Sequence, residues 1–507
     1  MSEQLTFAQL LRSLAARQPD SPYLISSDSG RELSCGRLWQ QCQHLGRQFK
    51  ALGLDTGDKV SVYMPNGELT AVLLLGIMAN GLVANPINLM CQHAQLKHVL
   101  DHSDTRLIFT SKEQAGTLAA ALREVDRDIR VVECDPASDD VPLFAPDPVA
   151  GATMAEPAPD DPALLMYTSG TTGVPKGVLH SHDSLIYNGR CISEAHRLTR
   201  NDRVLGSLPL YHINGLVVTL IAPLVHEGSV VMTPRFSAAS FWTDASRFQC
   251  TWINVVPTII SYLLNDGNDR AMPDLSRLRF CRSASSALAP EHHRAFENRF
   301  GIGIIETMGL TETAAPAFSN PIEPEERRIG SIGTPSGMRA MVITADGKQA
   351  APQGKGEIIL HGRNVMLGYY KDPERTRETF TDDGWLKTGD IGYQDEQGYF
   401  YVTGRAKELI IKGGENIAPR EIDEAVIKHP NILEAAAVGV PHPDYGQDIA
   451  VYLVLRDKAA FDGDALRRHC LSELGKYKTP SKYVVVDELP RGPSGKVQRL
   501  KLLELGA

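Results

Sequence analysis

Apolar and polar residues switch between a helical and a strand period along the first part of the chain. Residues 5–52 carry apolar positions at helical spacing, starting with Leu5-Thr6-Phe7-Ala8-Gln9-Leu10-Leu11, and predict helix. Residues 60–64 and 106–110 predict strands, and 71–80 predicts a helix between them. Alternation of this kind is typical of βαβ units and a mostly parallel sheet.

The pattern changes further along the chain. Residues 135–163 are rich in Pro, Asp and Ala without a clear period, which predicts a surface linker. Short apolar runs at 252–256 and 303–306 predict buried strands, and the alternating segment 356–360 predicts a more antiparallel β region. The last hundred residues predict a small unit with helices at 419–429 and 464–474 and strands at 435–440, 449–455 and 483–486.

The length of 507 residues exceeds what one hydrophobic core supports, so at least two domains are expected. The fold class predicted is α/β, with a large N-terminal domain of βαβ subdomains plus a β-rich subdomain, and a small mobile α+β C-terminal domain. The expected boundaries are 1–404 for the large domain, 405–407 for a hinge and 408–507 for the small domain.

Composition narrows the classes of function. A net charge of −9 argues against binding to nucleic acid or anionic membranes. The N-terminus lacks a signal-peptide pattern, and the longest apolar runs are too short to cross a bilayer. None of the eight cysteines has C-x-x-C spacing, so a structural zinc site is not expected. A cytoplasmic protein without membrane or nucleic-acid partners is the expectation.

One motif indicates phosphate chemistry. Residues 167–177 read Tyr-Thr-Ser-Gly-Thr-Thr-Gly-Val-Pro-Lys-Gly and lie between two apolar runs, so they form a loop between strands. Gly170 and Gly173 allow backbone N–H groups to turn toward an anion, the neighbouring hydroxyls add donors, and Lys176 adds a positive charge. The spacing is not that of a Walker A loop, because the position of its second glycine is Pro175.

This string resembles the phosphate loop of the adenylate-forming superfamily, which contains acyl-CoA synthetases, nonribosomal adenylation domains and firefly-type luciferases. Further segments match that superfamily in the right order: 211–215 (Tyr-His-Ile-Asn-Gly), 308–312 (Met-Gly-Leu-Thr-Glu), 388–390 (Thr-Gly-Asp), 404–408 (Gly-Arg-Ala-Lys-Glu) and 494–496 (Ser-Gly-Lys). The resemblance implies an ATP-dependent acyl-CoA synthetase that forms an acyl adenylate and then a CoA thioester.

The resemblance also implies roles for individual residues. Lys496, Thr311, Glu312 and His212 would be catalytic, and Glu312 would hold the Mg²⁺ that accompanies ATP, since Mg²⁺ prefers oxygen ligands. Met308 replaces an aromatic residue that stacks on adenine in the superfamily, and its sulfur can pack on a purine instead. The expected ATP-binding residues are Thr168, Ser169, Gly170, Thr171, Thr172, Gly173, Lys176, Ser285, Met308, Gly309, Thr311, Asp390, Arg405 and Lys496.

A hinge and a CoA site follow from the same resemblance. Lys407 matches the position where the small domain pivots between the two half-reactions. In one orientation Lys496 would reach the reacting carboxylate, and in the other Lys412, Gly413 and Gly414 would face the site and admit CoA. A plain β-turn is the alternative for these glycines.

The identity of the acid depends on the predicted acyl pocket, which comprises His212, Asn214, Arg282 and Ser283. A buried guanidinium needs a partner. A second anionic group on the substrate would supply one, and the Arg-Ser-x-Ser-Ser pattern at 282–286 resembles the branch that activates oxalate and related small acids such as malonate and sulfoacetate. The alternative is that Arg282 pairs with a protein carboxylate and never meets substrate.

Other functions compatible with this sequence remain open. A CoA ligase for a neutral medium-chain or coumarate-like acid is the main alternative. An amino-acid adenylation domain would place an acidic residue in the pocket, and residues 211–215 offer none. A luciferase-like oxygenase and a non-enzymatic nucleotide sensor are further alternatives, although a sensor would be expected to lose Lys496 or Glu312. A homodimer is the base-rate expectation for an enzyme.

Overall fold

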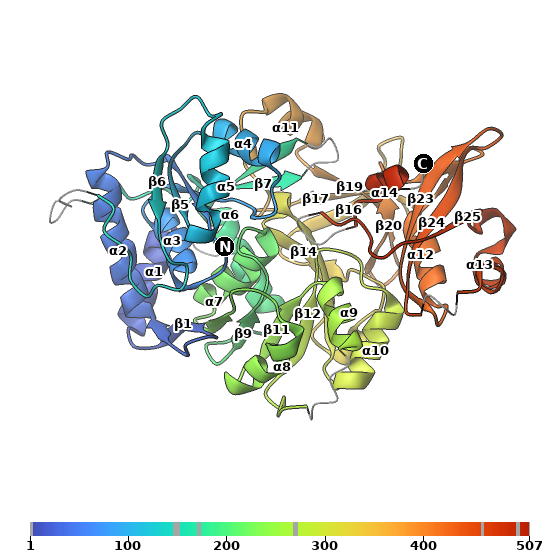
Figure 1. Ribbon diagram of the computed structural model, residues 1–507, viewed down its shortest axis with the longest axis horizontal. Coiled ribbons are helices and arrows are strands. Elements are labelled where there is room, and N and C mark those ends of the chain that lie inside the picture. Colours follow the sequence, from blue (N-terminus) through green and yellow to red (C-terminus); the bar gives the residue numbers. More distant parts are fainter. Residues whose placement is uncertain are drawn as a thin grey trace.

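The computed structural model describes residues 4–145, 153–169, 174–266, 272–457, 461–492 and 497–505. It shows an α/β protein with a large N-terminal body, blue to light orange in Figure 1, and a smaller C-terminal unit in deeper orange and red beside it. The predicted fold class is therefore confirmed. Two large sheets and one smaller antiparallel sheet build the body, and a fourth sheet forms the core of the C-terminal unit.

The first large sheet has the strand order β18-β8-β7-β4-β3-β5-β6. Its neighbours from β7 to β6 pair in parallel, whereas β7, β8 and β18 pair antiparallel. The strands are β3 (Lys59–Tyr63), β4 (Val83–Pro86), β5 (Thr105–Thr110), β6 (Arg130–Glu133), β7 (Pro162–Ser169), β8 (Pro175–Ser181) and β18 (Gly368–Tyr369). The helices that accompany it are α3 (Glu68–Ala79), α4 (His93–His102), α5 (Lys112–Leu122) and α11 (Pro373–Thr379).

The second large sheet has the order β15-β14-β13-β12-β11-β9-β10-β1-β2 and is parallel from β13 to β1. Its strands are β1 (Pro22–Ser26), β2 (Glu32–Ser34), β9 (Arg203–Gly206), β10 (Ser229–Met232), β11 (Trp252–Val255), β12 (Phe280–Ser283), β13 (Ile304–Leu310), β14 (Ala315–Ser319) and β15 (Thr334–Pro335). The connecting helices are α1 (Phe7–Arg17), α2 (Cys35–Ala51), α6 (His182–Ala195), the π-helix η1 (Asn214–Ile221), α7 (Ala222–Val225), α8 (Ala238–Arg247), α9 (Pro257–Asn265), α10 (Pro290–Phe300) and the 3₁₀ turns η2 (Thr311–Thr313) and η3 (Pro324–Glu326).

The antiparallel β region predicted after residue 340 is confirmed. Its sheet has the order β16-β17-β19-β20, with β16 (Arg339–Ile343), β17 (Gly356–His361), β19 (Leu386–Gln394) and β20 (Phe400–Arg405). The C-terminal unit contains β21 (Ile410–Lys412), β22 (Glu415–Ile417), β23 (Ile432–His442), β24 (Gly446–Leu455) and β25 (Lys482–Val485), together with α12 (Pro419–Ile427), α13 (Gly463–Lys478) and α14 (Arg499–Leu505).

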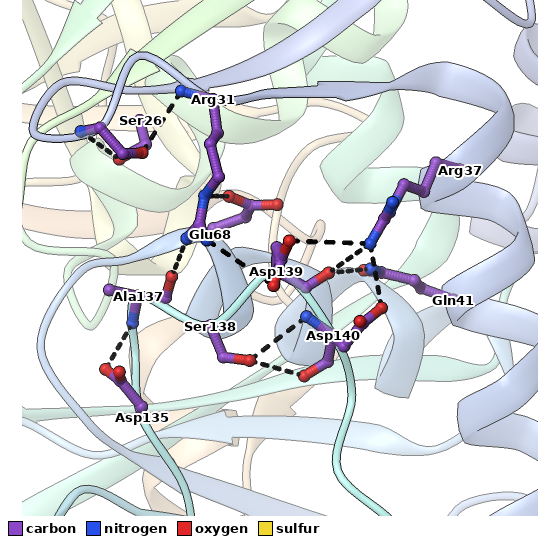
Figure 2. A network of polar contacts seen from close by, with 11 residues as sticks. Ser26, Arg31, Arg37, Gln41, Glu68, Asp135, Ala137, Ser138, Asp139 and Asp140 are labelled. Atoms are coloured by element: carbon purple, nitrogen blue, oxygen red, sulfur yellow. Dashed lines mark hydrogen bonds and ion pairs between the residues drawn. The ribbon is translucent and has the colours of Figure 1, made fainter.

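Helix α3 joins the two large sheets into one core. Every residue of α3 is buried, and the helix contacts β3 and β4 of the first sheet and β1 of the second. A helix that is apolar all round is stable only when it is covered on all sides. Beside it, the segment 135–140 crosses the start of α3, as Figure 2 shows, and the Leu69 N–H donates to the Pro136 carbonyl at 3.0 Å. Gly67 is required there, because a Cβ would lie 2.1 Å from that oxygen.

The helical prediction for residues 5–52 is wrong in its middle part. The structure has two helices, α1 and α2, separated by the strands β1 and β2. Leu24 and Leu33 on these strands are fully buried, and β1 pairs in parallel with β10, more than 200 residues away. Pairing with a distant strand is invisible to a local periodicity, which explains the error.

Candidate active site

The predicted phosphate loop joins the strands β7 and β8, which are together called the phosphate hairpin. Strands β7 and β8 pair antiparallel, with Thr168 opposite Lys176 and Ser169 opposite Pro175. This register places Thr168 beside Lys176 of the neighbouring strand. Four of the predicted ATP-binding residues lie outside the described residues: Gly170, Thr171, Thr172 and Gly173.

Lys176 is linked to Glu312 through a tyrosine that sequence reasoning missed. The Lys176 ammonium donates to the Tyr369 hydroxyl at 3.2 Å and lies over its ring, 4.5 Å from the centroid. The Tyr369 hydroxyl in turn donates to Glu312 Oε1 at 2.7 Å. Burial lowers the pKa of Lys176, and the Glu312 carboxylate opposes that shift. These contacts bring the phosphate hairpin and the Thr311–Glu312 motif into one site.

The Met308–Glu312 motif runs from the end of β13 into the turn η2. Gly309 is pressed against β14, since a Cβ there would lie 2.1 Å from the Ala315 carbonyl oxygen. Ala314 and Ala315 both adopt positive φ values, 55° and 88°, which are strained for residues other than glycine. Met308 packs against the hydrophobic cluster formed by the antiparallel sheet. The turn is therefore tightly constrained where catalysis is expected.

Asp390 and Arg405 form an ion pair across two neighbouring strands. They are directly opposite in the β19–β20 register, and Arg405 Nε lies 2.9 Å from Asp390 Oδ1. Asp390 is buried, and its carboxylate raises the pKa of Arg405 above the ordinary value despite burial. The predicted hinge residue Lys407 is exposed in the turn that follows β20, where the Glu408 N–H donates to the Arg405 carbonyl at 2.9 Å.

Arg282 is held by two amides. Its Nη1 donates to the side-chain oxygens of Asn214 at 2.8 Å and Asn254 at 2.7 Å. Asn254 also donates to Asn214 at 3.2 Å, and the Asn214 amide donates to Ser285 Oγ at 3.2 Å. The guanidinium is only 1% exposed, and burial lowers its pKa to about 9. No carboxylate in the described ranges lies within ion-pair distance of Arg282, so no protein carboxylate there neutralises it.

Asn254 was missed by sequence reasoning, although the signal existed. It lies on β11, in direct register with Arg282 on the neighbouring strand β12, and it is fully buried. A buried asparagine within an apolar strand needs hydrogen-bond partners, and that need was a usable indication.

The other two predicted acyl-pocket residues to be placed are His212 and Ser283. His212 is half-buried just before the π-helix η1, with its ring 4.8 Å from that of Tyr211. Ser283 is fully buried on β12, opposite Glu306 of β13, and its hydroxyl oxygen has no hydrogen-bond partner among the described residues. Ser283 therefore lies on the strand face opposite to that of Arg282.

Lys412 points into the C-terminal unit. It is 7% exposed, its ammonium lies 2.6 Å from Asp448 Oδ1, and it donates to the Tyr477 carbonyl at 2.9 Å. Gly413 and Gly414 follow at the exposed turn between β21 and β22, with φ values of 54° and 84°. In this arrangement the lysine side chain supports the unit itself, and the two glycines lie at its surface.

The predicted catalytic residue Lys496 lies outside the described residues. Residues near it in sequence do contact the body. Arg491 Nη1 donates to the Thr258 hydroxyl at 3.1 Å, and Arg491 also pairs with Glu434 at 2.5 Å. Arg456 donates to Asn265 at 2.7 Å, so two arginines of the C-terminal unit reach helix α9. Thr258 lies in the first turn of α9, and Asn265 is its last residue.

Glu312 is the residue expected to hold Mg²⁺. It is half-buried, one of its oxygens accepts from Tyr369, and the phosphate hairpin lies beside it. Mg²⁺ is commonly held by one or two carboxylates together with substrate phosphates and water. The described ranges hold no cluster of three or more His, Cys, Asp or Glu side chains that could hold a metal ion. Within the same ranges, no helix is long and apolar enough to cross a membrane.

Similarity to known proteins covers nearly the whole chain. The family model of AMP-binding enzyme matches residues 11–370, and that of the AMP-binding enzyme C-terminal domain matches 421–496. The chain is 62% identical over 498 residues to a sulfoacetate–CoA ligase of Cupriavidus necator, covering 98% of this chain and 97% of that protein. It is 34% identical over 504 residues to an oxalate–CoA ligase of Arabidopsis thaliana, covering 97% of each. ATP-bound MatB from Rhodopseudomonas palustris matches with a TM-score of 0.89 at 30% identity over 99% of each chain. The chain therefore belongs to the AMP-binding enzyme family, and within it to the adenylate-forming acyl-CoA synthetases.

Proposed function

We propose that this acyl-CoA synthetase acts on a small carboxylic acid that carries a second anionic group, of the sulfoacetate, oxalate or malonate type. The acid carboxylate attacks the α-phosphorus of ATP to give an acyl adenylate and diphosphate. The CoA thiol then attacks the acyl carbon and releases AMP. ATP, CoA and a carboxylic acid are the substrates of such a ligase, and relatives named for sulfoacetate and oxalate support the class of acid.

The observation that carries the proposal is the polar surrounding of Arg282. Two neutral amides hold its guanidinium without cancelling its charge. Because Arg282 is only 1% exposed, its positive charge acts on the acid through a chain of hydrogen bonds. Asn214 accepts a hydrogen bond from Arg282 and donates one to Ser285. Ser285 is half-buried, and its hydroxyl can donate a hydrogen bond to an anion. A positive potential at low dielectric favours a doubly anionic acid over a neutral one.

The remaining roles are proposed from the geometry and from the family. The phosphate hairpin with Lys176 binds the ATP phosphates, and Thr311 binds the α-phosphate. Glu312 would hold Mg²⁺, which would supply charge stabilisation for the leaving diphosphate. Asp390 would accept hydrogen bonds from the ribose hydroxyls, with Arg405 beside it, as their pairing across β19 and β20 allows. Met308 and Gly309 would border the adenine.

The small domain, proposed as residues 408–507, would pivot at 405–407 against the body formed by 1–404. Lys496 would stabilise the charge that develops during adenylation, since an ammonium offers three donors. After rotation, Gly413 and Gly414 would border the pantetheine arm, where the lack of side chains permits close approach. A homodimer and a cytoplasmic location stay predictions, which light scattering and fractionation test.

The test is diphosphate release with ATP and Mg²⁺ across sulfoacetate, oxalate, malonate, acetate, octanoate and coumarate, for wild type and Arg282→Met. We expect an anionic acid to be preferred in wild type, and the variant to lose that preference by about tenfold or more while keeping measurable turnover of neutral acids. Preference of wild type for a neutral acid, unchanged in Arg282→Met, would contradict the proposed substrate class and leave the ligase assignment intact.

A further inference from the structure

Three consecutive carbonyls of the turn η2 are each held by a different part of the fold. The Thr311 carbonyl accepts from His180 at 2.7 Å, the Glu312 carbonyl from the Met366 N–H at 2.8 Å, and the Thr313 carbonyl from the Asn188 amide at 2.7 Å. His180 lies on β8, Asn188 on α6, and Met366 just before β18. The turn that carries Thr311 and Glu312 is thus fixed from three sides.

The contact from His180 differs from the other two because it comes from the phosphate hairpin itself. His180 follows Lys176 by four residues on β8, so both side chains stand on the same face of that strand. Lys176 reaches Glu312 through Tyr369, and His180 reaches the backbone of Thr311 directly. One strand therefore sets the position of both residues of the motif.

The hydrogen-bonding pattern fixes the state of the His180 ring. A carbonyl oxygen can only accept, so Nε2 must carry a hydrogen, and Nδ1 faces Ser184 Oγ at 3.3 Å. The ring is fully buried, and burial lowers its pKa to about 4, which keeps it neutral near pH 7. The Thr311 carbonyl accepts a second hydrogen bond from the Ala314 N–H at 3.1 Å, so His180 fills its remaining lone pair.

We propose that His180 is a positioning residue that couples the phosphate hairpin to the Thr311–Glu312 turn, so that Glu312 is in place for Mg²⁺ when ATP phosphates bind. The inference rests on the proposed roles of Thr311 and Glu312. Without the bond to Thr311 O, the turn loses its tie to β8, and a displacement of about 1 Å at a positioned group costs roughly a hundredfold in turnover at the upper end. The effect is specific to Mg²⁺-dependent binding of ATP.

The experiment measures the Kd of ATP by calorimetry, with Mg²⁺ and with a chelator, in the absence of any acid. His180→Asn retains a polar group near Nδ1 but cannot reach Thr311, whereas the longer His180→Gln places an amide donor near Nε2. We expect the Mg²⁺-dependent gain in affinity to fall about tenfold in His180→Asn and to stay within about twofold of wild type in His180→Gln. His182→Asn is the matched control, since His182 is equally buried but accepts from the Phe7 N–H, far from the turn.

The inference is overturned if Mg²⁺ raises the affinity for ATP as much in His180→Asn as in wild type. It is also overturned if His182→Asn loses as much of this Mg²⁺-dependent gain as His180→Asn does. Absence of any Mg²⁺-dependent gain in wild type contradicts the proposed role of Glu312 instead, and with it the basis of this inference. If His180→Asn fails to fold, a hydrogen-exchange experiment on the wild-type protein tests the inference instead. With ¹⁵N-histidine labelling, the His180 Nε2–H should exchange about tenfold more slowly with Mg²⁺ and ATP than with ATP and chelator, and an unchanged rate overturns the coupling.

Discussion

The guanidinium of Arg282 donates to the side-chain oxygen of Asn254 at 2.7 Å, where a carboxylate of the same shape would also fit. The neutral amide satisfies the hydrogen bond and leaves the positive charge uncancelled. If that charge selects anionic acids, the choice of amide over carboxylate at residue 254 is part of the specificity.

Asn254→Asp tests this relation without changing the shape of the side chain. The added charge forms an ion pair with Arg282, so we expect kcat/KM for sulfoacetate, oxalate or malonate to fall about tenfold or more. Turnover of neutral acids should be maintained or raised. Asn201→Asp, on the exposed surface, is the control for net charge and should change neither measure.

Tyr369→Phe removes the hydroxyl that bridges Lys176 and Glu312. Burial, with the Glu312 charge as a lesser cause, raises the pKa of Tyr369 well above its ordinary value, so the hydroxyl keeps its hydrogen and donates. Hydrogen bonds to charged groups contribute roughly 1.5–3 kcal/mol, so we expect kcat/KM for ATP to fall about ten- to a hundredfold. Tyr370→Phe is the control, because the Tyr370 hydroxyl donates to Asp104, outside the motif. Equal losses in both variants would contradict the bridging role.

The strand–loop–strand arrangement around residues 167–177 could be predicted from the sequence because it depends on a short local string. The pairing of Asp390 with Arg405 was not predicted, since it joins the two strands β19 and β20. The contact of Tyr369 with Glu312 and that of Asn254 with Arg282 could not be predicted, since they join residues 57 and 28 positions apart. The inward orientation of Lys412 depends on Asp448 and Tyr477, which no local pattern connects to it. Strand β1 was likewise hidden, because its parallel partner β10 is far away in sequence.

Thr258→Val tests the contact between the C-terminal unit and helix α9. The change keeps the volume of the side chain and removes the oxygen that accepts from Arg491. If this contact stabilises the orientation used for adenylation, diphosphate release in a single turnover should slow several-fold. Thioester formation from supplied acyl adenylate should not slow. Asn265→Ala, which removes the acceptor of Arg456, should act in the same direction. Slowing of both half-reactions to the same extent would argue against this role.

The stability of the protein should fall as the pH drops from 6.5 toward 5. Burial lowers the pKa of His180, His182 and His226 to about 4 and that of His196 to about 3. Between these values and 6.5 the unfolded chain binds more protons than the folded chain, so stability rises with pH across this window. Urea midpoints at pH 7.5, 6.5, 5.8 and 5.0 measure the effect. His226→Gln should give a shallower slope, and a flat profile in wild type would refute the prediction.

Two glycine replacements should have opposite outcomes. Gly116 lies exposed in α5, and nothing would contact an added Cβ within 4 Å, so Gly116→Ala should raise the free energy of unfolding by up to ~1 kcal/mol.

Gly309→Ala forces its Cβ against Ala315 and should lower the rate of adenylation by more than about tenfold through displacement of the neighbouring motif. Urea denaturation and diphosphate release measure the two effects. Unchanged diphosphate release in Gly309→Ala would show that the site tolerates the displacement.

Arg499 lies three residues beyond Lys496 and is anchored at the base of the C-terminal unit. It pairs with buried Asp423, donates to the Ala437 carbonyl at 2.9 Å, and lies 3.5 Å from Glu408, directly after the hinge position. These contacts therefore hold Arg499 beside the predicted hinge. If the unit rotates at the predicted hinge, the predicted catalytic residue Lys496 would move with it in one step, so the withdrawal of Lys496 and the entry of CoA would occur at the same rate.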